Sequence, residues 1–590
     1  MPDSALIYQL KIERFRGVEN LRWNPSEGMN VILGGGDVGK TTILEAIALL
    51  LSPSNSVVLS EADYWLRNTD SEFIIQGILS LPPSSEISQQ SKFAWPWEWN
   101  GEEAVPPIVP DGEDDDIPTP SQPVYRVQVR GTNELEVNWE IVQPNDDLDT
   151  LSAAVRRKIG VVRLGGEERN DRDLRLVYGS ALDRLLADKG LRARIGQEVS
   201  GINLQDKLSD EAKKALQKLD KALAKEALPN NLELGLTSSQ GLSIGALVGL
   251  LAEREKDISL PLASWGAGTR RMATLQIAVA TEAETRITVI DEIERGLEPY
   301  RVRKLVRDLQ SQPTQSFVTT HSAVAISAAA GGHLCFLDHA GNIGHLPREK
   351  IARQQDRDPE TFLSRLAIIA EGPTEIGFLS HILERAIDGD LADHGLRVCD
   401  GQGNESTLGL LEAMAEAKLI FAGFADDEGK FAGRWATLKT TMGSSLFRWD
   451  AGCTEENVLA AIDDADLPRL ITDADADVQA ERRITLANRL GIEDRSLEAI
   501  VAGTSGATPT LQELIVAAAT GNKEGAPDAD LEKTWKKHGQ RWFKSETGGR
   551  ELAAQMFALN AWPQLKPRLL PFINAIRNAV GQTEIQDVTP

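Results

Sequence analysis

Residues 29–50 read MNVILGGGDVGKTTILEAIALL. The apolar run 29–33 predicts a buried strand, and the apolar run 42–50 predicts a helix. Between them, Gly34 to Thr41 match G-x-x-x-x-G-K-S/T, a loop whose main-chain N–H groups close around phosphate oxygens at the start of a helix. In such a loop Lys40 would reach the β- and γ-phosphates, and the Thr41 hydroxyl would ligate Mg²⁺. The stretch therefore predicts an α/β domain that binds ATP with Mg²⁺ through Gly34, Gly36, Gly39, Lys40, Thr41 and Thr42.

Two later strands end in residues that complete such a site. The apolar run 286–290 ends in Asp291 and Glu292. Asp291 is placed to hold the Mg²⁺ shell, and Glu292 to orient or deprotonate the attacking water. Residues 296–299 follow at the distance of a D-loop. The run 318–320 ends in His321, which this motif order favours as a γ-phosphate sensor over a structural histidine.

Residues 263–271, ASWGAGTRR, resemble the signature loop of ABC-type ATPases in the variant used by RecF, Rad50 and SMC heads. Residues 12–17 resemble the first strand of the same heads. The resemblance implies that Ser264 and Gly266 contact nucleotide held by a second protomer, and hence a head-to-head homodimer or higher oligomer. Gly36 stands where these ATPases usually carry Asn, and Gln76 is the nearest Q-loop candidate, so the hydrolysis rate stays open.

The second half of the chain carries acids at successive strand ends. Residues 366–375 read LAIIAEGPTE, a predicted strand that ends in Glu371, turns on Gly-Pro and enters a helix with Glu375 one turn later. Phosphodiester cleavage with two divalent cations needs several carboxylates on rigid strand ends. We therefore predict a metal site formed by Glu371, Glu375, Asp426, Glu428 and Glu456. Asp427 and Glu455 are interpreted as adjacent bystanders, and Cys453 as a core residue.

This order of acids resembles the TOPRIM domain, with Glu428 in a place where Asp is common. Residues 542–553, WFKSETGGRELA, resemble the lysine-glycine motif of the OLD (overcoming lysogenization defect) family, which joins an ABC ATPase to a TOPRIM nuclease. The resemblance implies a DNA substrate, a catalytic set of Glu371, Asp426 and Lys544 beside Glu292 of the ATPase, and two Mg²⁺ or Mn²⁺ ions, with Ca²⁺ as a further candidate. Lys544 is expected to stabilise the transition-state phosphate.

The helical insert and the lack of a long coiled coil look most like the OLD class found beside a superfamily 1 (UvrD-like) helicase, which includes the Gabija anti-phage nuclease subunit. The fold class is thus α/β, an ABC-type (RecF/Rad50/SMC-like) head with a helical insertion followed by an α/β TOPRIM domain with its own insert. The expected segments are an ATPase lobe at 1–164 with an acidic loop at 95–123, a helical dimerisation insert at 165–231, a second ATPase lobe at 232–348, a linker at 349–364, the TOPRIM domain at 365–562 with an insert at about 463–530, and a C-terminal helix or tail at 563–590.

Composition limits the other possibilities. The formal net charge of −25 is unusual for a protein that holds DNA by neutralising phosphates. DNA affinity is therefore expected to depend on a restricted groove, on Mg²⁺ or on a basic partner. The three cysteines show no CxxC spacing, which argues against a disulfide framework and a zinc site. No signal peptide and no apolar run of roughly 18 residues is evident, so a cytoplasmic location without a membrane partner is expected.

Two other functions of TOPRIM domains are disfavoured. All five tyrosines precede residue 301, outside the TOPRIM-like half, which argues against a self-contained topoisomerase. Primases usually bring a zinc module, which three scattered cysteines do not form. A RecF/SMC-like DNA-bound ATPase clamp with an inactive second domain remains the alternative, and a plasmid nicking assay separates it from a nuclease.

Overall fold

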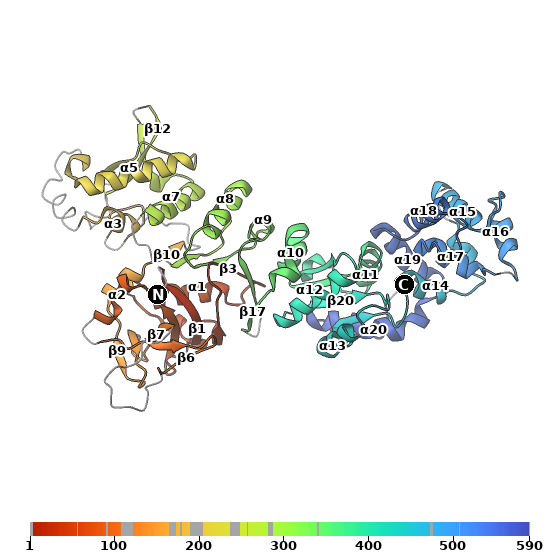
Figure 1. Cartoon of the computed structure of the whole chain (residues 1–590), viewed down its shortest axis with the longest axis horizontal. Helices are drawn as coiled ribbons and strands as arrows, with labels where there is room; N and C mark the ends of the chain where they lie inside the picture. The colour runs from red at the N-terminus through yellow and green to blue at the C-terminus, as the bar shows by residue number, and fades with distance from the viewer. Residues whose placement is uncertain are drawn as a thin grey trace. The chain divides into compact units, whose positions relative to one another are not determined.

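The computed structural model describes residues 4–55, 57–89, 93–107, 122–164, 173–177, 180–188, 191, 204–236, 248–256, 258–280, 287–338, 341–419, 421–472, 476–506 and 508–588. The chain forms two compact units, Met1–His345 and Leu346–Pro590 (Figure 1). Within the described ranges, no helix combines the length and the apolar character needed to cross a bilayer.

An antiparallel sheet forms one part of the first unit. Its strands β1, β4 and β7 pair side by side, with β2 beside β1 and β8 beside β7. Alternating apolar residues such as Leu10 and Ile12 of β1 are fully buried, as a sheet with one covered face requires. The strands are β1 (Leu6–Phe15), β2 (Val18–Trp23), β4 (Phe73–Ser80), β5 (Trp97–Trp99), β6 (Ala104–Val105), β7 (Pro123–Gly131), β8 (Val137–Val142) and β9 (Leu148–Thr150).

A second sheet of the same unit carries the nucleotide motifs. Its order is β10-β14-β15-β3-β16-β17, and every pair except β16 with β17 is parallel. Strands β3, β14 and β15 are wholly buried, as parallel strands covered on both faces are. Because these strands run the same way, their carboxyl ends meet at one edge of the sheet. The strands are β3 (Met29–Gly34), β10 (Val161–Leu164), β14 (Ile287–Ile290), β15 (Ser316–Thr319), β16 (His333–Leu337) and β17 (Ile343–His345).

Helix α1 (Lys40–Leu50) packs between the two sheets of this unit. Its Ile43, Leu44 and Ile47 join one core with side chains of β1, β4 and β14. The other α-helices in the described part of this unit are α2 (Ala153–Ile159), α3 (Ala181–Leu186), α5 (Asp210–Lys225), α7 (Ala267–Ala280), α8 (Pro299–Gln310) and α9 (Ala323–Ala328). A small sheet holds β11 (Glu233–Leu236), β12 (Val248–Glu255) and β13 (Ile258–Pro261).

The helical insert expected at 165–231 contains α3 and α5, while residues 165–172, 178–179, 189–190 and 192–203 lie outside the described residues. Helix α5 buries Ala212, Leu216, Leu219 and Leu223, which recur at helical spacing along the sequence and form one stripe. Helices α3 and α5 pack against each other and against α7 (Figure 1). The insert therefore stacks on the helix that follows the signature loop.

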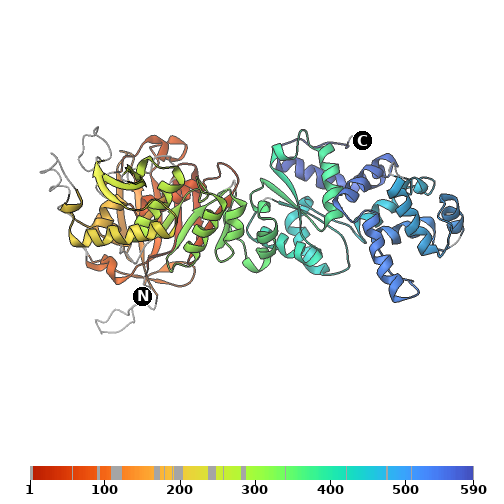
Figure 2. The same cartoon turned by 90° about the horizontal axis from the view of Figure 1, so that it is seen from above.

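A four-stranded parallel sheet of order β19-β18-β20-β21 forms the centre of the second unit. Every residue of β18 is buried, so both faces of the sheet are covered, and helices lie on either side of it in Figure 2. The strands are β18 (Leu366–Ala370), β19 (Leu396–Asp400), β20 (Phe421–Ala425) and β21 (Leu446–Arg448). The helices are α10 (Arg348–Arg357), α11 (Pro373–Ala386), α12 (Asn404–Glu416), α13 (Ala432–Met442), α14 (Thr454–Ala460), α15 (Ala476–Leu490), α16 (Leu497–Thr504), α17 (Leu511–Thr520), α18 (Ala529–His538), α19 (Glu546–Ala558) and α20 (Trp562–Ala579).

Three expected boundaries differ from the structure. The linker predicted at 349–364 is instead α10 and a short turn, because Ile351, Gln354 and Gln355 are buried against the second unit. The acidic loop predicted at 95–123 contains the strands β5 and β6, where Trp97 and Trp99 are buried; residues 108–121 lie outside the described residues. The C-terminal helix α20 belongs to the core of the second unit, through Leu565, Leu569 and Phe572.

Candidate nucleotide site and acidic pocket

The phosphate loop joins β3 to α1, and two of its glycines adopt backbone angles that other residues rarely adopt. Gly34 has φ +150°, and a Cβ there would lie 2.4 Å from the carbonyl oxygen of Leu337. Gly39, directly before α1, has φ +101°. Gly36, which stands where these ATPases usually carry Asn, has open space on its Cβ side. Packing therefore does not require a glycine at this position. Thr41 and Thr42 then form the first turn of α1.

Three strand ends meet at the first turn of α1. The Thr41 hydroxyl lies 3.1 Å from Oδ2 of Asp291, and the Thr319 hydroxyl donates to Oδ1 of Asp291 over 2.5 Å. A hydroxyl beside a carboxylate is the oxygen pair that Mg²⁺ takes in phosphate-loop sites. Lys40 Nζ lies 3.0 Å from the carbonyl oxygen of Gly34. Burial lowers the pKa of Lys40, and Asp291 opposes that shift. These residues fit a Mg²⁺-nucleotide.

Glu294, which the sequence reasoning missed, organises the edge of this site. Its Oε1 accepts the main-chain N–H of His321 over 2.7 Å, and its Oε2 accepts the Thr320 hydroxyl over 2.6 Å. Glu292 adopts φ +48°, and its N–H donates to the Thr319 hydroxyl over 2.8 Å. Its carboxylate is half-exposed and lies 3.4 Å from the Arg295 guanidinium. The structure thus brings Thr41, Asp291, Glu292 and His321 to one edge of the sheet, as the motif order predicted.

The signature loop packs directly on the D-loop. Ser264 ends a turn at Leu262–Ser264 and is exposed, with its hydroxyl 2.7 Å from the carbonyl oxygen of Pro261. A Cβ at Gly268 would lie 2.0 Å from the carbonyl oxygen of Gly296, so α7 touches the D-loop backbone to backbone. Gln76 lies inside β4 and its amide donates to Gln128 over 3.1 Å, which makes it a sheet residue and leaves the Q-loop unassigned.

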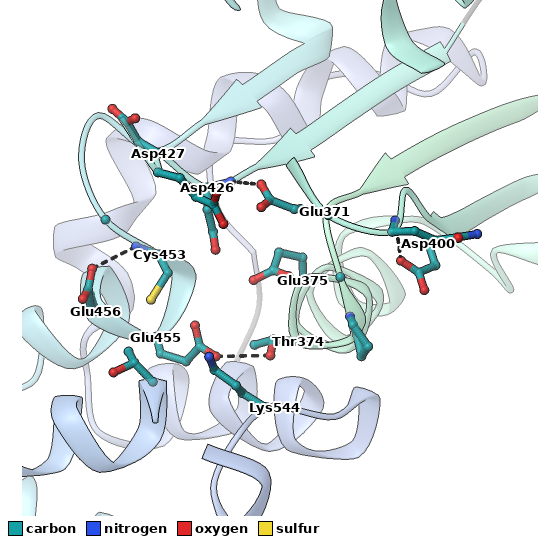
Figure 3. A pocket seen from close by; sticks show the side chains of 17 residues that line it. Glu371, Thr374, Glu375, Asp400, Asp426, Asp427, Cys453, Glu455, Glu456 and Lys544 are labelled. Atoms are coloured by element: carbon teal, nitrogen blue, oxygen red, sulfur yellow. Dashed lines mark hydrogen bonds between the residues drawn. The ribbon is translucent and has the colours of Figure 1, made fainter. Parts of the chain in front are cut away.

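A cavity of about 550 Å³ opens at the carboxyl ends of the parallel strands in the second unit (Figure 3). Glu371 follows β18, Asp426 follows β20, and Glu375 lies in the first turn of α11. The further side chains that line it include Asp400, Asp427, Glu428, Cys453, Glu455, Glu456 and Lys544. The five acids predicted to bind metal in this half of the chain and the predicted lysine, Lys544, therefore line one cavity. The most distant of them in sequence, Glu371 and Lys544, are 173 residues apart (544 − 371).

Glu371 is buried and held from two sides. Its Oε2 accepts from Asn404 Nδ2 and from the main-chain N–H of Asp426, each over 3.1 Å. Trp435 donates to Asn404 Oδ1 over 3.3 Å, which fixes the amide. Burial raises the pKa of Glu371, and the two hydrogen bonds reduce that shift. Asn404 is a positioning residue that no spacing pattern in the sequence indicated.

Asp426 and Glu375 form the most crowded part of the pocket. Oδ1 of Asp426 lies 3.0 Å from both the main-chain N–H and the hydroxyl of Thr454. Burial, then the charges of Glu371 and Glu455, raise the pKa of Asp426 to about 8. Burial, then Asp426 and Glu455, raise the pKa of Glu375 well above its usual value. Carboxylates that disfavour each other's charge in a buried site fit divalent cations, which would supply the missing positive charge.

Glu455 and Glu456 both line the cavity, but their carboxylates point in different directions from the first turn of α14. The carboxylate of Glu456 accepts the main-chain N–H of Cys453 over 3.0 Å at the start of α14, which directs it to the helix end. Glu455 is only 3% exposed and faces the cavity, with Oε1 3.2 Å from the Thr374 hydroxyl (Figure 3). The sequence interpreted Glu455 as a bystander, whereas its side chain lies in the pocket wall. The side chain at the third helical position, Glu456, caps the helix, and Glu455 before it points in another direction.

Asp427 and Glu428, at the margin of the pocket, each form an ion pair with a basic side chain. The Asp427 carboxylate and the Arg448 guanidinium are 2.5 Å apart, and Arg448 also donates to the carbonyl oxygen of Asp426 over 3.3 Å. Glu428 lies 3.0 Å from Lys430 and is half-exposed. Asp427 is thus held by an ion pair, and Glu428 is the most exposed of the metal ligands predicted for this pocket.

Lys544 reaches the pocket because two helices touch without side chains between them. A Cβ at Gly377 of α11 would lie 1.9 Å from the carbonyl oxygen of Glu546, at the start of α19. The residues before α19 are fixed in turn, since the Thr374 hydroxyl lies 3.0 Å from the carbonyl oxygen of Phe543. Figure 3 shows the Lys544 side chain extending towards Glu455 and Thr374. The glycines of the ETGG stretch explain how the lysine is placed.

Two family models match the first unit. One, described as "AAA domain, putative AbiEii toxin, Type IV TA system", matches residues 136–327. The other, described as "AAA domain", matches residues 9–91. Together they span the phosphate loop, the signature loop, Asp291 and His321. No curated protein matches the chain in sequence.

Several solved structures share weak likeness with the chain. The SMC head domain of Pyrococcus furiosus, bound to the C-terminal domain of ScpA, is 14% identical over 59% of this chain and 98% of that chain, with a TM-score of 0.36. The recombination mediator protein RecF with ATP is 14% identical over 58% of this chain and 99% of that chain, with a TM-score of 0.34. The SMC head domain of Thermotoga maritima is 12% identical over 56% of this chain and 94% of that chain, with a TM-score of 0.26. Likenesses of this size carry no argument about function. On the family models and the motif geometry, the first unit contains an AAA-type ATPase domain of the ABC kind.

Proposed function

We propose that this protein is an ATP-binding, divalent-metal-dependent DNA endonuclease or nickase of the OLD type, with TOPRIM chemistry in its second unit. One observation carries the proposal: Glu371, Glu375, Asp426 and Lys544 line a single cavity at the carboxyl edge of a parallel sheet. Ligand and catalytic sites of open α/β sheets lie at this edge. A buried set of carboxylates with one lysine suits metal-assisted cleavage of a phosphodiester.

The residues of the cavity have separable tasks. Glu371, Glu375, Asp426 and Glu455 would hold two Mg²⁺ or Mn²⁺ ions, with Glu428 at the exposed margin. The bound ions supply charge neutralisation at phosphorus and a more acidic water. Asn404 and Thr454 keep Glu371 and Asp426 in orientation through the hydrogen bonds described above. Lys544 would pair with a non-bridging phosphate oxygen and stabilise the charge that builds up in the transition state.

The acidity of the pocket also explains how an acidic protein could hold DNA. Without cations, the carboxylates would repel a phosphate backbone, and the chain carries a net charge of −25. Divalent cations bound to these carboxylates would instead present positive charge to the scissile phosphate. DNA affinity is therefore expected to rise steeply with divalent metal, as the composition suggested.

The ATPase domain would regulate cleavage through dimerisation. Ser264 is exposed on the signature loop, and Thr41 and Asp291 are ready to hold Mg²⁺ with nucleotide. Two heads related by a two-fold axis would place Ser264 of each against nucleotide held by the other, and the insert containing α5 would extend that dimer. A helicase partner of the UvrD type and a role in anti-phage defence rest on the family resemblance alone.

A plasmid nicking assay with Mg²⁺ or Mn²⁺ tests the proposal. We expect wild type to convert supercoiled plasmid to open-circular or linear DNA, and Glu371→Gln and Lys544→Ala to lose at least about a hundredfold in rate while unfolding at the same temperature as wild type. Asp393→Asn, an exposed change in the same unit, is the control. A wild type that binds DNA without cleaving it would favour the ATPase clamp instead, and Lys544→Ala with wild-type cleavage would remove the role of this lysine.

A further inference from the structure

Cys453 lies in the wall of the acidic pocket, where the sequence suggested only a core residue. Its Sγ, a carboxylate oxygen of Asp426 and a carboxylate oxygen of Glu455 all lie within 4.8 Å of one another. The backbone builds this arrangement: Cys453 precedes α14, and the N–H and hydroxyl of Thr454 both hold Oδ1 of Asp426 at 3.0 Å. The thiol and Glu455 therefore belong to one short segment, and Thr454 of that segment holds Asp426 beside them.

A fourth acid, Glu375, faces the same place without an ion pair to a basic side chain of the described residues. Glu375 is 5% exposed, and Figure 3 shows its carboxylate directed into the pocket between Asp426 and Glu455. In the described part of the chain, no Lys, Arg or His side chain forms an ion pair with Glu375, Asp426 or Glu455, whereas Asp427 and Glu428 each have one. Buried carboxylates without a counter-charge are costly, which points to a bound cation at this position.

The thiol decides which cation fits. Mg²⁺ and Ca²⁺ prefer oxygen ligands only, whereas a thiolate selects softer ions such as Zn²⁺. We propose that Asp426, Cys453 and Glu455 form a mixed thiolate and carboxylate site for Zn²⁺ or a similarly soft divalent cation, with Glu375 available for a fourth position. Cysteine sulfur and the oxygens of Asp or Glu are all ligands that Zn²⁺ accepts, and its sites usually hold four ligands.

This site overlaps the pocket proposed for cleavage, so its consequence for activity rests on the proposed function. An ion held by Asp426 and Glu455 withdraws both carboxylates from Mg²⁺ or Mn²⁺. Zn²⁺ should therefore inhibit Mg²⁺-supported cleavage, and replacing the thiol should relieve that inhibition. Binding itself does not depend on whether the pocket cleaves DNA.

A spectroscopic titration tests the binding. Metal-free full-length protein is titrated with Cd²⁺ and with Co²⁺, and the ultraviolet thiolate-to-metal charge-transfer band is recorded. We expect the band in wild type and in Cys399→Ala, and its loss in Cys453→Ser. Cys399 is the matched control because it is a second cysteine of the same unit, buried in β19, and it is not a member of the group formed by Asp426, Cys453 and Glu455. No band in wild type, or an undiminished band in a folded Cys453→Ser, would overturn the site.

A second arm separates this inference from the proposed function. Zn²⁺ inhibition of Mg²⁺-supported plasmid nicking should weaken at least about tenfold in Cys453→Ser, which keeps all four acids. A Cys453-dependent band in a protein that cleaves nothing would support the zinc site and contradict the nuclease. Mg²⁺-supported cleavage with no Cys453-dependent band, and equal Zn²⁺ inhibition in both proteins, would contradict the zinc site and leave the nuclease standing.

Discussion

Gly549 of α19 lies against the main chain of Thr374 in α11, so that a Cβ at 549 would sit 2.0 Å from the Thr374 carbonyl oxygen. The approach is reciprocal, because Gly377 of α11 meets the carbonyl oxygen of Glu546. Thr374 also contacts Phe543 and Glu455 through its hydroxyl. The distance between the two helices therefore sets where Lys544 stands relative to the acids.

Gly549→Ala should displace α19 from α11. The added methyl has no room against backbone, so we expect a loss of about 1–3 kcal/mol in the free energy of unfolding and a fall in DNA cleavage larger than the unfolded fraction explains. Chemical denaturation and plasmid nicking measure the two effects. Gly409→Ala in α12 is the control, because its Cβ would meet open space and alanine favours a helix. Equal stability of Gly549→Ala and wild type would mean that the helices are not in this contact.

Metal-free protein should lose stability as pH rises. Asp426 has its pKa raised to about 8 in the folded protein, against 3.8 for its ordinary value, and the pKa of Glu375 is raised as well. Between these two pKa values the folded protein keeps a proton that the unfolded chain has released. The contribution of this proton to the free energy of unfolding is therefore fully present below about pH 4 and is lost as pH rises towards 8. Thermal unfolding in a chelator from pH 5 to 8.5 should show this fall at the transition of the second unit.

Two comparisons isolate the cause of that pH dependence. Asp426→Asn should flatten the curve, because the amide does not ionise. Mn²⁺ should restore stability at the high-pH end, since bound cations favour the ionised carboxylates and release protons. A curve that is identical in wild type and Asp426→Asn would show that the carboxyl groups do not share a buried charge.

Adjacent acids on α14 should respond differently to the same substitution. Glu455→Gln removes a carboxylate that faces the cavity, so metal binding and cleavage should fall by at least about tenfold. Glu456→Gln weakens the start of the helix at Cys453, so it should cost about 0.5–1 kcal/mol of stability and leave metal affinity within about twofold. Calorimetric Mn²⁺ titration of the two variants measures the contrast. The reverse ranking would restore the original prediction for Glu456.

Local signals in the sequence were sufficient for most of the architecture. The strands expected at 29–33 and 366–370 are confirmed as Met29–Gly34 and Leu366–Ala370, because continuous apolar runs bounded by glycine or acids have few other solutions. The stripe of Leu216, Leu219 and Leu223 is likewise the buried face of α5. The prediction of a linker at 349–364 was wrong because α10 is mostly polar in sequence, and only a few of its residues, such as Ile351, pack on the second unit.

The candidate site was less predictable, because its geometry depends on contacts between distant residues. Parallel strands bring Glu371 and Asp426 to one edge, which follows from topology. The roles of Asn404, Thr454 and Glu294 follow only from side-chain directions that no spacing rule supplies. Glu455 and Glu456 differ by one position in a helix, and the residue at which α14 begins decides which of them enters the pocket.

Glu294 should matter for ATP hydrolysis without touching nucleotide. Its carboxylate holds the main chain of His321 and the hydroxyl of Thr320, so Glu294→Ala should misplace the histidine that we expect to sense the γ-phosphate. We expect steady-state ATPase activity to fall about tenfold while affinity for ATP changes less than about twofold, because the contacts at Lys40 and Thr41 are retained. His321→Ala should lose a similar amount, and the double variant little more, since both changes remove one interaction. Glu134→Ala, an exposed acid in the turn between β7 and β8, is the control. Additive losses in the double variant would mean that Glu294 does not act through His321.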